Sequence, residues 1–150
     1  LPGRLMLLPG AGVGGHCIAV DPWFIIGGAP DEARLIRMAR EVNDSKPTWV
    51  LDKGKAAMTD FLAAHPDRSL ADLKLACLGL AFKPDIDDLR ESPALEITRD
   101  FAQLGCEILA VEPHISELPA VLQGTSARLV DLDTAMAEAD VICVELPTLH

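Results

Sequence analysis

Hydrophobic residues recur at helical spacing through much of the first half of the chain. From residue 33 onward they fall three or four positions apart, at Ala33, Leu35, Ile36, Met38, Ala39 and Val42. This spacing is typical of one face of a helix. The acidic pair at 31–32, which follows Pro30, favours a helix start at that point. The pattern therefore predicts a helix over 31–43, and apolar positions resume over 49–62.

The segment between these two stretches, Asn-Asp-Ser-Lys-Pro at 43–47, leaves two interpretations open. Ser45 or Asp44 can cap a second helix that has Pro47 in its first turn. Alternatively, the segment only kinks one long helix. The polar stretch at 65–69 marks the next boundary. We therefore expect one structural unit over 1–68 and a second over 69–150.

The second half of the chain alternates between strand and helix patterns. Residues 73–82 form a nearly continuous apolar run, as expected for a parallel strand covered on both faces. Ser92 and Pro93 open a helix that runs to about Leu104, with Gly105 as its stop. The remaining pattern predicts a strand at 107–111, a short apolar segment at 128–130, a helix at 131–138 and a strand at 141–146.

This alternation predicts the α/β class, with a Rossmann-like, doubly wound parallel sheet preceded by a loop and a long connecting helix. Ligands of such sheets bind beyond the carboxyl ends of the strands. Residues 82–92 follow the first predicted strand directly. We therefore expect chemistry at this loop.

Composition narrows the classes of partner. The 150 residues contain 13 Lys and Arg against 23 Asp and Glu, a formal charge of −10, which argues against binding to nucleic acid or to an anionic membrane. No apolar run approaches the roughly 18 residues of a membrane span, and no signal peptide is recognisable. The four cysteines form no CxxC pair, so we predict no metal site and expect a cytoplasmic protein. Because the chain begins at Leu1, we expect it to be a piece of a longer protein.

Residues 10–15 (GAGVGG) match the dinucleotide fingerprint G-x-G-x-x-G letter for letter. The fingerprint requires a helix that opens at its third glycine and an acidic residue after the next strand. Here Pro9 interrupts the approach, Pro22 follows too soon for a full helix, and no second strand comes next. We therefore expect that this run does not bind a dinucleotide.

The same glycines precede a cysteine, Cys17, and an aspartate four residues later, Asp21. Glycines let the backbone approach a ligand closely and leave a thiol unobstructed. Cys17 is thus a candidate nucleophile, and Asp21 a candidate for ordering a water molecule. The spacing is equally compatible with a buried, apolar Cys17 and with Asp21 as a helix cap before Pro22.

The loop at 82–93 is the second candidate site. Lys83 and Arg90 supply two cations, and the free N–H groups of the helix that begins after Ser92 favour an anion. Such a loop suits a diphosphate. An ordinary solvated surface, on which the acidic residues of the loop pair with its two cations, fits the same residues.

Together these two stretches, G-V-G-G-H-C-I-A-V-D-P and G-L-A-F-K-P-D-I-D-D-L-R-E-S-P, resemble the UDP-glucose/GDP-mannose dehydrogenase family. The segment at 40–44 (REVND) is also similar to the connector helix of the family, so the resemblance covers nearly the whole chain. His16 before the cysteine, and residues 18–25 after it, look most like the branch that acts on UDP-N-acetylhexosamines.

The resemblance implies an NAD-dependent oxidation of a sugar C6 alcohol to a carboxylate. Cys17 would form a thiohemiacetal and then a thioester, and Asp21 would position water. Arg90 would reach toward the NAD cofactor. The residues implied in binding the UDP-sugar substrate are Gly12, Val13, Gly14, Gly15 and His16 in the first motif and Phe82 and Lys83 in the second.

The resemblance also implies what this chain lacks. The N-terminal NAD-binding domain of the family is missing, as are the upstream part of the central domain and the end of the C-terminal sheet. We therefore expect no turnover by the chain alone, and a homodimer formed through the connector helix. Candidate substrates are UDP-N-acetyl-D-mannosamine, UDP-N-acetylglucosamine and UDP-glucose. The product would be a uronic acid donor for the synthesis of surface polysaccharide.

Two other functions remain compatible with the residues. One is a nucleotide-binding module without catalysis that uses Lys83 and Arg90. The other is a cysteine hydrolase that uses His16 and Cys17, although adjacent residues seldom align an imidazole with a thiol for proton transfer.

Overall fold

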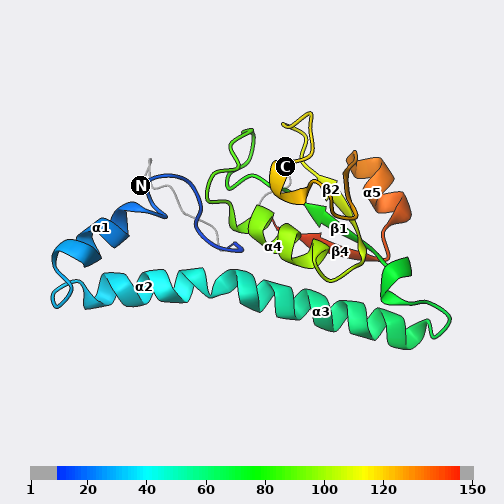
Figure 1. Cartoon of the computed structure of the whole chain (residues 1–150), viewed down its shortest axis with the longest axis horizontal. Helices are drawn as coiled ribbons and strands as arrows, with labels where there is room; N and C mark the ends of the chain where they lie inside the picture. Colours follow the sequence, from blue (N-terminus) through cyan, green and yellow to red (C-terminus); the bar gives the residue numbers. More distant parts are fainter. Residues whose placement is uncertain (1–9, 146–150) are drawn as a thin grey trace, which may run out of the picture.

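A parallel sheet lies alongside a long helical rod in the computed structural model of this chain (Figure 1). The structure describes residues 10–145. The apolar run at 5–8 and the last residue of the strand expected at 141–146 lie outside this range. The first helix, α1, spans Asp21–Gly28 and turns back beside the start of the rod (Figure 1).

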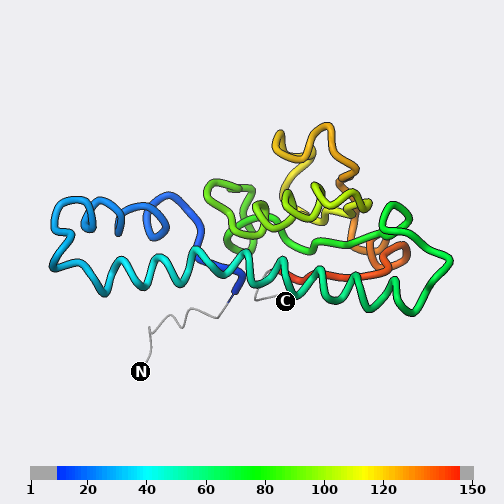
Figure 2. Tube along the Cα trace, turned by 60° about the horizontal axis from the view of Figure 1, so that its bottom comes forward, coloured from blue at the N-terminus to red at the C-terminus, as the bar shows by residue number. Residues whose placement is uncertain are grey.

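The rod consists of α2 (Arg34–Asp44) and α3 (Lys46–Ala64) and extends along the whole molecule (Figure 2). Ser45 between them keeps helical backbone angles, φ −80° and ψ −12°, and its N–H donates to the carbonyl of Glu41 at 3.1 Å. Its hydroxyl donates to the carbonyl of Val42 at 2.8 Å and caps no helix. Ser45 thus stands at the N-cap position of α3, with Pro47 in the first turn of that helix, as the two-helix interpretation of 43–47 predicts, although its side chain makes no cap. The helical backbone angles of Ser45 keep α2 and α3 in one continuous rod. No helix in residues 10–145 is long and apolar enough to cross a membrane.

The predicted start of the first rod helix is wrong by three residues. Instead of beginning at 31, α2 begins at Arg34, because the chain first makes a turn in which the N–H of Ala33 donates to the carbonyl of Ala29 at 2.9 Å. The acidic pair at 31–32 lies in this turn.

Four parallel strands form the sheet, in the order β3-β2-β1-β4. They span Lys74–Leu78 (β1), Glu107–Val111 (β2), Ala127–Leu129 (β3) and Val141–Val144 (β4). The predicted parallel α/β architecture is confirmed, and the apolar segment near 128–130 contributes a strand of its own. The strand expected over 73–82 is shorter, because Gly79, with φ +90°, turns the chain after Leu78.

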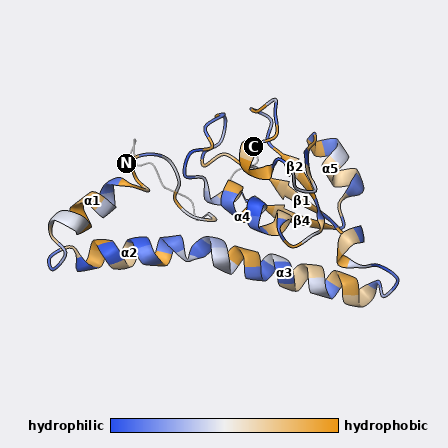
Figure 3. Cartoon of the chain, viewed as in Figure 1, coloured by the Kyte–Doolittle hydropathy of each residue, from blue (hydrophilic) through white to orange (hydrophobic). Residues whose placement is uncertain are grey.

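Both faces of the sheet are covered, by α4 (Pro93–Ala102) and α3 on one side and by α5 (Leu132–Glu138) on the other. Alternate residues of β1 pack into two hydrophobic cores, one on each face of the sheet. Leu75 and Cys77 belong to the larger core with Phe101 of α4, whereas Ala76 and Leu78 belong to the smaller core under α5. The hydrophobic colouring of β1 and β2 in Figure 3 reflects this double burial, whereas β4 leaves Ile142 and Val144 exposed.

The predicted cap at the start of α4 is confirmed, since the hydroxyl of Ser92 accepts from the N–H of Leu95 at 3.4 Å. Asp131, predicted as the first residue of a helix, instead caps α5 from outside, and its carboxylate accepts from the N–H of Thr134 at 2.7 Å. The end of α4 falls at Ala102, before Gly105 with φ +96°. Two short 3-10 turns, Leu70–Asp72 and Ala120–Leu122, complete the connections.

Candidate functional site

The glycine loop at 10–16 and the loop at 82–92 lie against each other beyond the carboxyl end of β1. The N–H of Gly15 donates to the carbonyl of Arg90 at 3.2 Å. A Cβ built on Gly14 would lie 2.6 Å from the Cβ of Phe82, and one on Gly15 would lie 2.8 Å from the Phe82 ring. Only glycine permits this approach, so the two sequence motifs that point to chemistry form one site.

The start of the glycine loop is fixed by α2 and α4. Gly12 has φ +148°, and a Cβ there would lie 3.0 Å from Cγ of Pro93. The N–H of Val13 donates to Oδ1 of Asn43, at the end of α2, at 3.1 Å. This link from the helical rod to the loop was not predicted, although an amide side chain near the end of a helix is a recognisable signal.

The Cys17 side chain is exposed. Its carbonyl accepts from the N–H of Val20 at 3.0 Å and from the N–H of Asp21 at 2.8 Å, which forms a tight turn just before α1. The alternative in which Cys17 is buried is therefore wrong for the described chain. This turn leaves the thiol accessible, as a nucleophile requires.

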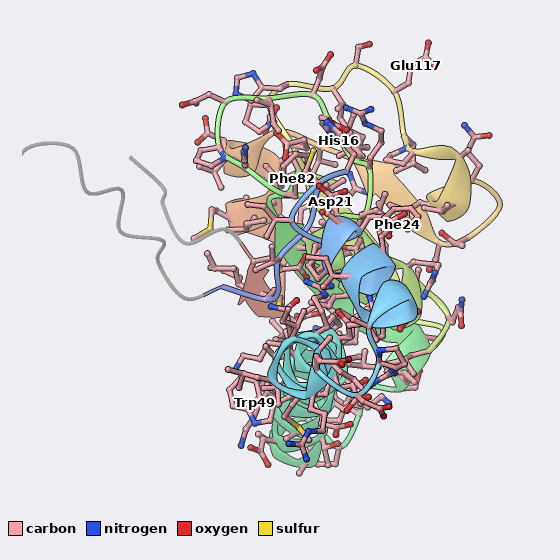
Figure 4. The ribbon with its side chains drawn as sticks, turned by 90° about the vertical axis from the view of Figure 1, so that its left-hand side faces the viewer. His16, Asp21, Phe24, Trp49, Phe82 and Glu117 are labelled. Atoms are coloured by element: carbon pink, nitrogen blue, oxygen red, sulfur yellow. The ribbon has the colours of Figure 1, made fainter. Side chains whose placement is uncertain are left out.

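Asp21 begins α1, and Pro22 lies in the first turn of this helix, so a helix does form there. The capping position is Val20, which makes no side-chain cap, so the interpretation of Asp21 as a cap is also wrong. Asp21, His16 and Phe82 lie in the upper part of the view in Figure 4, apart from Trp49 on the rod below.

Arg90 is held by Asp88, two residues earlier. The carboxylate of Asp88 accepts from Nε of Arg90 at 2.9 Å, from its Nη2 at 2.6 Å and from its N–H at 3.0 Å. These hydrogen bonds, with the smallest contribution from the nearby His16, lower the pKa of Asp88 to about 2. The same pair raises the pKa of Arg90, with a smaller contribution from the nearby Cys17. His16, Cys17 and Arg90 therefore share one electrostatic environment.

Lys83 is exposed, with its Nζ 5.4 Å from the centroid of the Phe82 ring. The pairing of Arg90 with Asp88 agrees with the interpretation as an ordinary acidic surface, whereas binding of a diphosphate by this loop stays a prediction. Two residues of the loop other than glycine adopt positive φ, Asp85 at +60° and Glu91 at +48°. Backbone strain of this kind is common at functional sites.

Glu112 was expected only to end a strand. It is 5% exposed, and its Oε2 accepts from the N–H groups of Leu80 at 2.9 Å and Ala81 at 3.0 Å. The sequence signal was an acidic residue directly after the second strand of a parallel sheet, a position that contributes to many sites of this class.

The run at 10–15 does not form a dinucleotide-binding turn. No helix opens at Gly15, because residues 16–20 form turns and α1 begins only at Asp21. The backbone of this run faces Phe82 and Pro93 instead. The structure therefore agrees with the expectation that this run is not an NAD fingerprint.

A cavity of about 610 Å³ lies behind the glycine loop, between α1, α2 and α4. Arg40 lines it and is buried, with its Nη2 2.5 Å from Oδ1 of Asp44 and its Nε without a hydrogen-bond partner. Neither Cys17 nor Lys83 lines this cavity. It is therefore separate from the exposed thiol.

Two models of one family match the chain. The central domain of the UDP-glucose/GDP-mannose dehydrogenase family matches residues 2–45, and the UDP binding domain of the same family matches residues 76–147. The two matches together cover the glycine loop, α1, α2 and most of the sheet.

Individual proteins give the same result. The chain is 60% identical over 138 residues to UDP-N-acetyl-D-mannosamine dehydrogenase of Escherichia coli (strain K12), which is 91% of this chain and 32% of that protein. A solved UDP-N-acetyl-mannosamine dehydrogenase from S. aureus superposes with TM-score 0.64 at 35% identity, over 97% of this chain and 31% of that one. A UDP-glucose dehydrogenase from Pyrobaculum islandicum has the same fold, with TM-score 0.76 at 23% identity, over 92% and 31%. The chain thus spans about a third of the length of the relatives it matches.

Proposed function

Because this chain belongs to the UDP-glucose/GDP-mannose dehydrogenase family, we propose that it supplies the thiol and the UDP-binding half of an NAD-dependent nucleotide-sugar 6-dehydrogenase. The proposed substrate is UDP-N-acetyl-D-mannosamine, supported by the 60% identity to a dehydrogenase named for it. The observation that carries the proposal is the hydrogen bond from Gly15 to Arg90, which joins the cysteine loop to the second motif.

We propose that the loop at 82–92 and the backbone of residues 12–15 hold the UDP-sugar. Lys83 would attract the diphosphate, because its ammonium is exposed beside the ring of Phe82. His16, which lies near Asp88, would contact the sugar or shape the turn. Because the chain is acidic overall, the electrostatic attraction of the diphosphate would come from these few local cations.

We propose that the thiolate of Cys17 attacks the C6 aldehyde formed by the first oxidation, which gives a thiohemiacetal. Loss of a hydride from C6 then gives a thioester, and water hydrolyses it to the carboxylate and regenerates the thiol. Asp21, at the start of α1 and one turn from the thiol, would position this water. The exposed thiol supports this role, since a buried one would not reach a substrate.

NAD would accept both hydrides. The described residues do not form a pyrophosphate cradle of the dinucleotide type, because no helix opens at Gly15. We therefore propose that another domain of a longer protein holds NAD, and that this chain contributes only Arg90 toward it. The Asp88 carboxylate fixes the Arg90 guanidinium for this contact.

We also propose a division into a central-domain part, 1–68, and a UDP-binding part, 69–150, supported by the two family matches on either side of this boundary. A homodimer through the rod is supported by exposed apolar side chains on α2 and α3, namely Leu35, Met38, Val42 and Trp49. A cytoplasmic location is supported by four cysteines that are all free. Synthesis of a surface polysaccharide is the proposed use of the product.

The test uses the longer protein that contains this chain. We expect two NADH per UDP-N-acetyl-D-mannosamine in the parent and at least a thousandfold loss of turnover in Cys17→Ser. Cys143→Ala, which removes a partly buried thiol in β4, is the matched control and should keep activity. Unaltered turnover by Cys17→Ser would exclude Cys17 as the nucleophile. Binding of UDP without any NADH formation would leave only a nucleotide-binding module.

A further inference from the structure

The carboxylate of Glu112 is buried, and both of its oxygens accept hydrogen bonds from backbone N–H groups of this chain. Oε2 accepts from the N–H groups of Leu80 and Ala81 at 2.9 and 3.0 Å, and Oε1 accepts from the N–H of His114 at 3.3 Å. The residue is 5% exposed. A buried carboxylate costs free energy unless it is hydrogen-bonded, so these bonds hold the two loops together.

The segment that Glu112 holds leads directly into the second motif. The N–H of Gly79 donates to the carbonyl of Val111 at 2.8 Å, and the hydroxyl of Ser92 donates to the carbonyl of Leu80 at 2.6 Å. Both hydrogen-bonding groups of Leu80 are thereby occupied. The backbone that precedes Phe82 is thus held by hydrogen bonds on both sides, two of which end on Glu112.

The position of Phe82 in turn constrains the glycine loop that precedes Cys17. Its Cβ and ring lie where side chains on Gly14 and Gly15 would have to be, so a shift of Phe82 would move the glycines. A second, outer link joins the loop that follows β2 to the loop at 82–92, because Nε2 of His114 lies 3.6 Å from Oδ1 of Asp85. That pair is exposed, so the inner carboxylate carries most of the constraint.

The use of Glu112 differs from that of an acid at the same place in a dinucleotide-binding unit. There, the acidic residue that follows the second strand accepts from a ribose hydroxyl. Here, Oε2 already accepts two N–H groups and the side chain faces its own chain. In this chain the carboxylate at this position therefore supports a loop.

We propose that Glu112 is a positioning residue for binding of the nucleoside diphosphate, because it fixes the backbone from which Phe82 and Lys83 project. This inference rests on the proposed function, in which these two residues hold the UDP portion of the substrate. Glu112 itself does not touch the ligand.

The experiment compares three variants of Glu112 in the longer enzyme. Glu112→Met removes both acceptors at nearly constant volume, and Glu112→Asp withdraws the carboxylate by one methylene. Glu112→Gln keeps one oxygen that can face Leu80 and Ala81 and loses only the longer bond from the N–H of His114. We expect the KM for the UDP-sugar to rise at least tenfold in Glu112→Met and severalfold in Glu112→Asp. In Glu112→Gln this KM should stay within about threefold of the parent. The KM for NAD should stay within twofold throughout.

The matched control is Glu117→Met, an exposed carboxylate in the same loop, which should leave both KM values unchanged (Figure 4). Amide hydrogen exchange at residues 80–83 is measured on the same samples and should accelerate in Glu112→Met and Glu112→Asp. An unchanged KM for the UDP-sugar in Glu112→Asp, or equal rises in Glu112→Gln and Glu112→Met, would overturn the proposal. If Glu112→Met does not fold, the comparison of Glu112→Asp with Glu112→Gln decides. Absence of UDP-sugar binding by the parent would instead contradict the proposed function.

Discussion

The N–H of Gly15 donates to the carbonyl of Arg90 at 3.2 Å, and this bond joins two motifs that lie far apart in the sequence. The contact needs the glycine loop to lie directly on Phe82 and Pro93. The residue types point to both motifs, but the tertiary structure brings the thiol loop to the loop with the cations, through this hydrogen bond and the packing of Gly14 and Gly15 on Phe82. The first prediction tests this packing.

Gly14→Ala should separate the two loops. The added Cβ would meet the carbonyl oxygen of Glu91 and lie 2.6 Å from the Cβ of Phe82. Overpacking of this kind costs roughly 1–3 kcal/mol. We expect a loss of at least tenfold in kcat/KM in the longer enzyme and faster exchange of the Gly15 amide. Gly27→Ala, where a Cβ meets nothing within 4 Å, is the control. Equal activity in both variants would show that the loops are not packed as described.

Gly54→Ala should weaken the contact between the rod and the sheet unit. In an ordinary helix this change stabilises by roughly 0.5–1 kcal/mol. Here the Cβ would meet Cζ of Phe101 and lie 2.6 Å from its Cε1, so the sign reverses. We expect a lower Tm by thermal unfolding of the 150-residue chain, against a neutral or slightly raised Tm for Gly27→Ala. A raised Tm in Gly54→Ala would contradict the packing of α3 on α4.

Asp88→Asn should weaken the proposed contact of Arg90 with NAD. The pKa of Asp88 is lowered to about 2, so the carboxylate stays ionised at any pH used for assay, and its stabilising effect is lost only as the pH falls from the ordinary carboxyl range toward 2. Asn cannot hold both Nε and Nη2 of Arg90 as a carboxylate does.

We expect Asp88→Asn to raise the KM for NAD by about three- to tenfold, at all pH values between 6 and 9, with the KM for the UDP-sugar nearly unchanged. The neighbouring, exposed Asp87→Asn should leave both constants as in the parent. If the KM for the UDP-sugar rises instead, Arg90 belongs to the substrate rather than to the cofactor.

Glu145, directly after β4, should make the stability of the chain depend on pH. It is 5% exposed, its Oε1 has no hydrogen-bond partner among residues 10–145, and the hydroxyl of Thr98 is 3.4 Å from its Oε2. Burial raises the pKa of this carboxyl well above its usual range, which favours the neutral form in the folded chain. The same surroundings raise the pKa of the Cys143 thiol to about 12.

A carboxyl with a raised folded pKa contributes stability that is fully present below the unfolded pKa of about 4.3 and is lost as the pH rises toward the folded value. Glu145→Gln removes this dependence. We expect the variant to be more stable than the parent in denaturant unfolding at pH 8, with the difference shrinking toward pH 4. The exposed Glu117→Gln should show no such trend. A parent that is equally stable at both pH values would contradict a neutral Glu145.

Much of the sheet unit was predictable, because its signals are local. The boundaries of β2, 107–111, follow from an apolar run between a glycine and a Glu-Pro pair, and the start of α4 follows from Ser92, whose hydroxyl bonds an N–H three residues on. The start of α2 was wrong by three residues, because the turn at Ala33 depends on a backbone bond that composition does not reveal.

The sequence by itself determined the residue types of the site: a cysteine after a glycine run, an aspartate four residues on, and a cationic loop after a buried strand. Tertiary structure alone decided that Cys17 is exposed, that Gly14 and Gly15 lie on Phe82, and that Glu112 supports the second loop. The physical reason is the separation along the chain of the groups that interact. A cap or an apolar run acts within one turn or one strand, whereas the bond from Leu80 to Glu112 spans 32 residues and forms only when parallel strands bring their carboxyl ends to one edge.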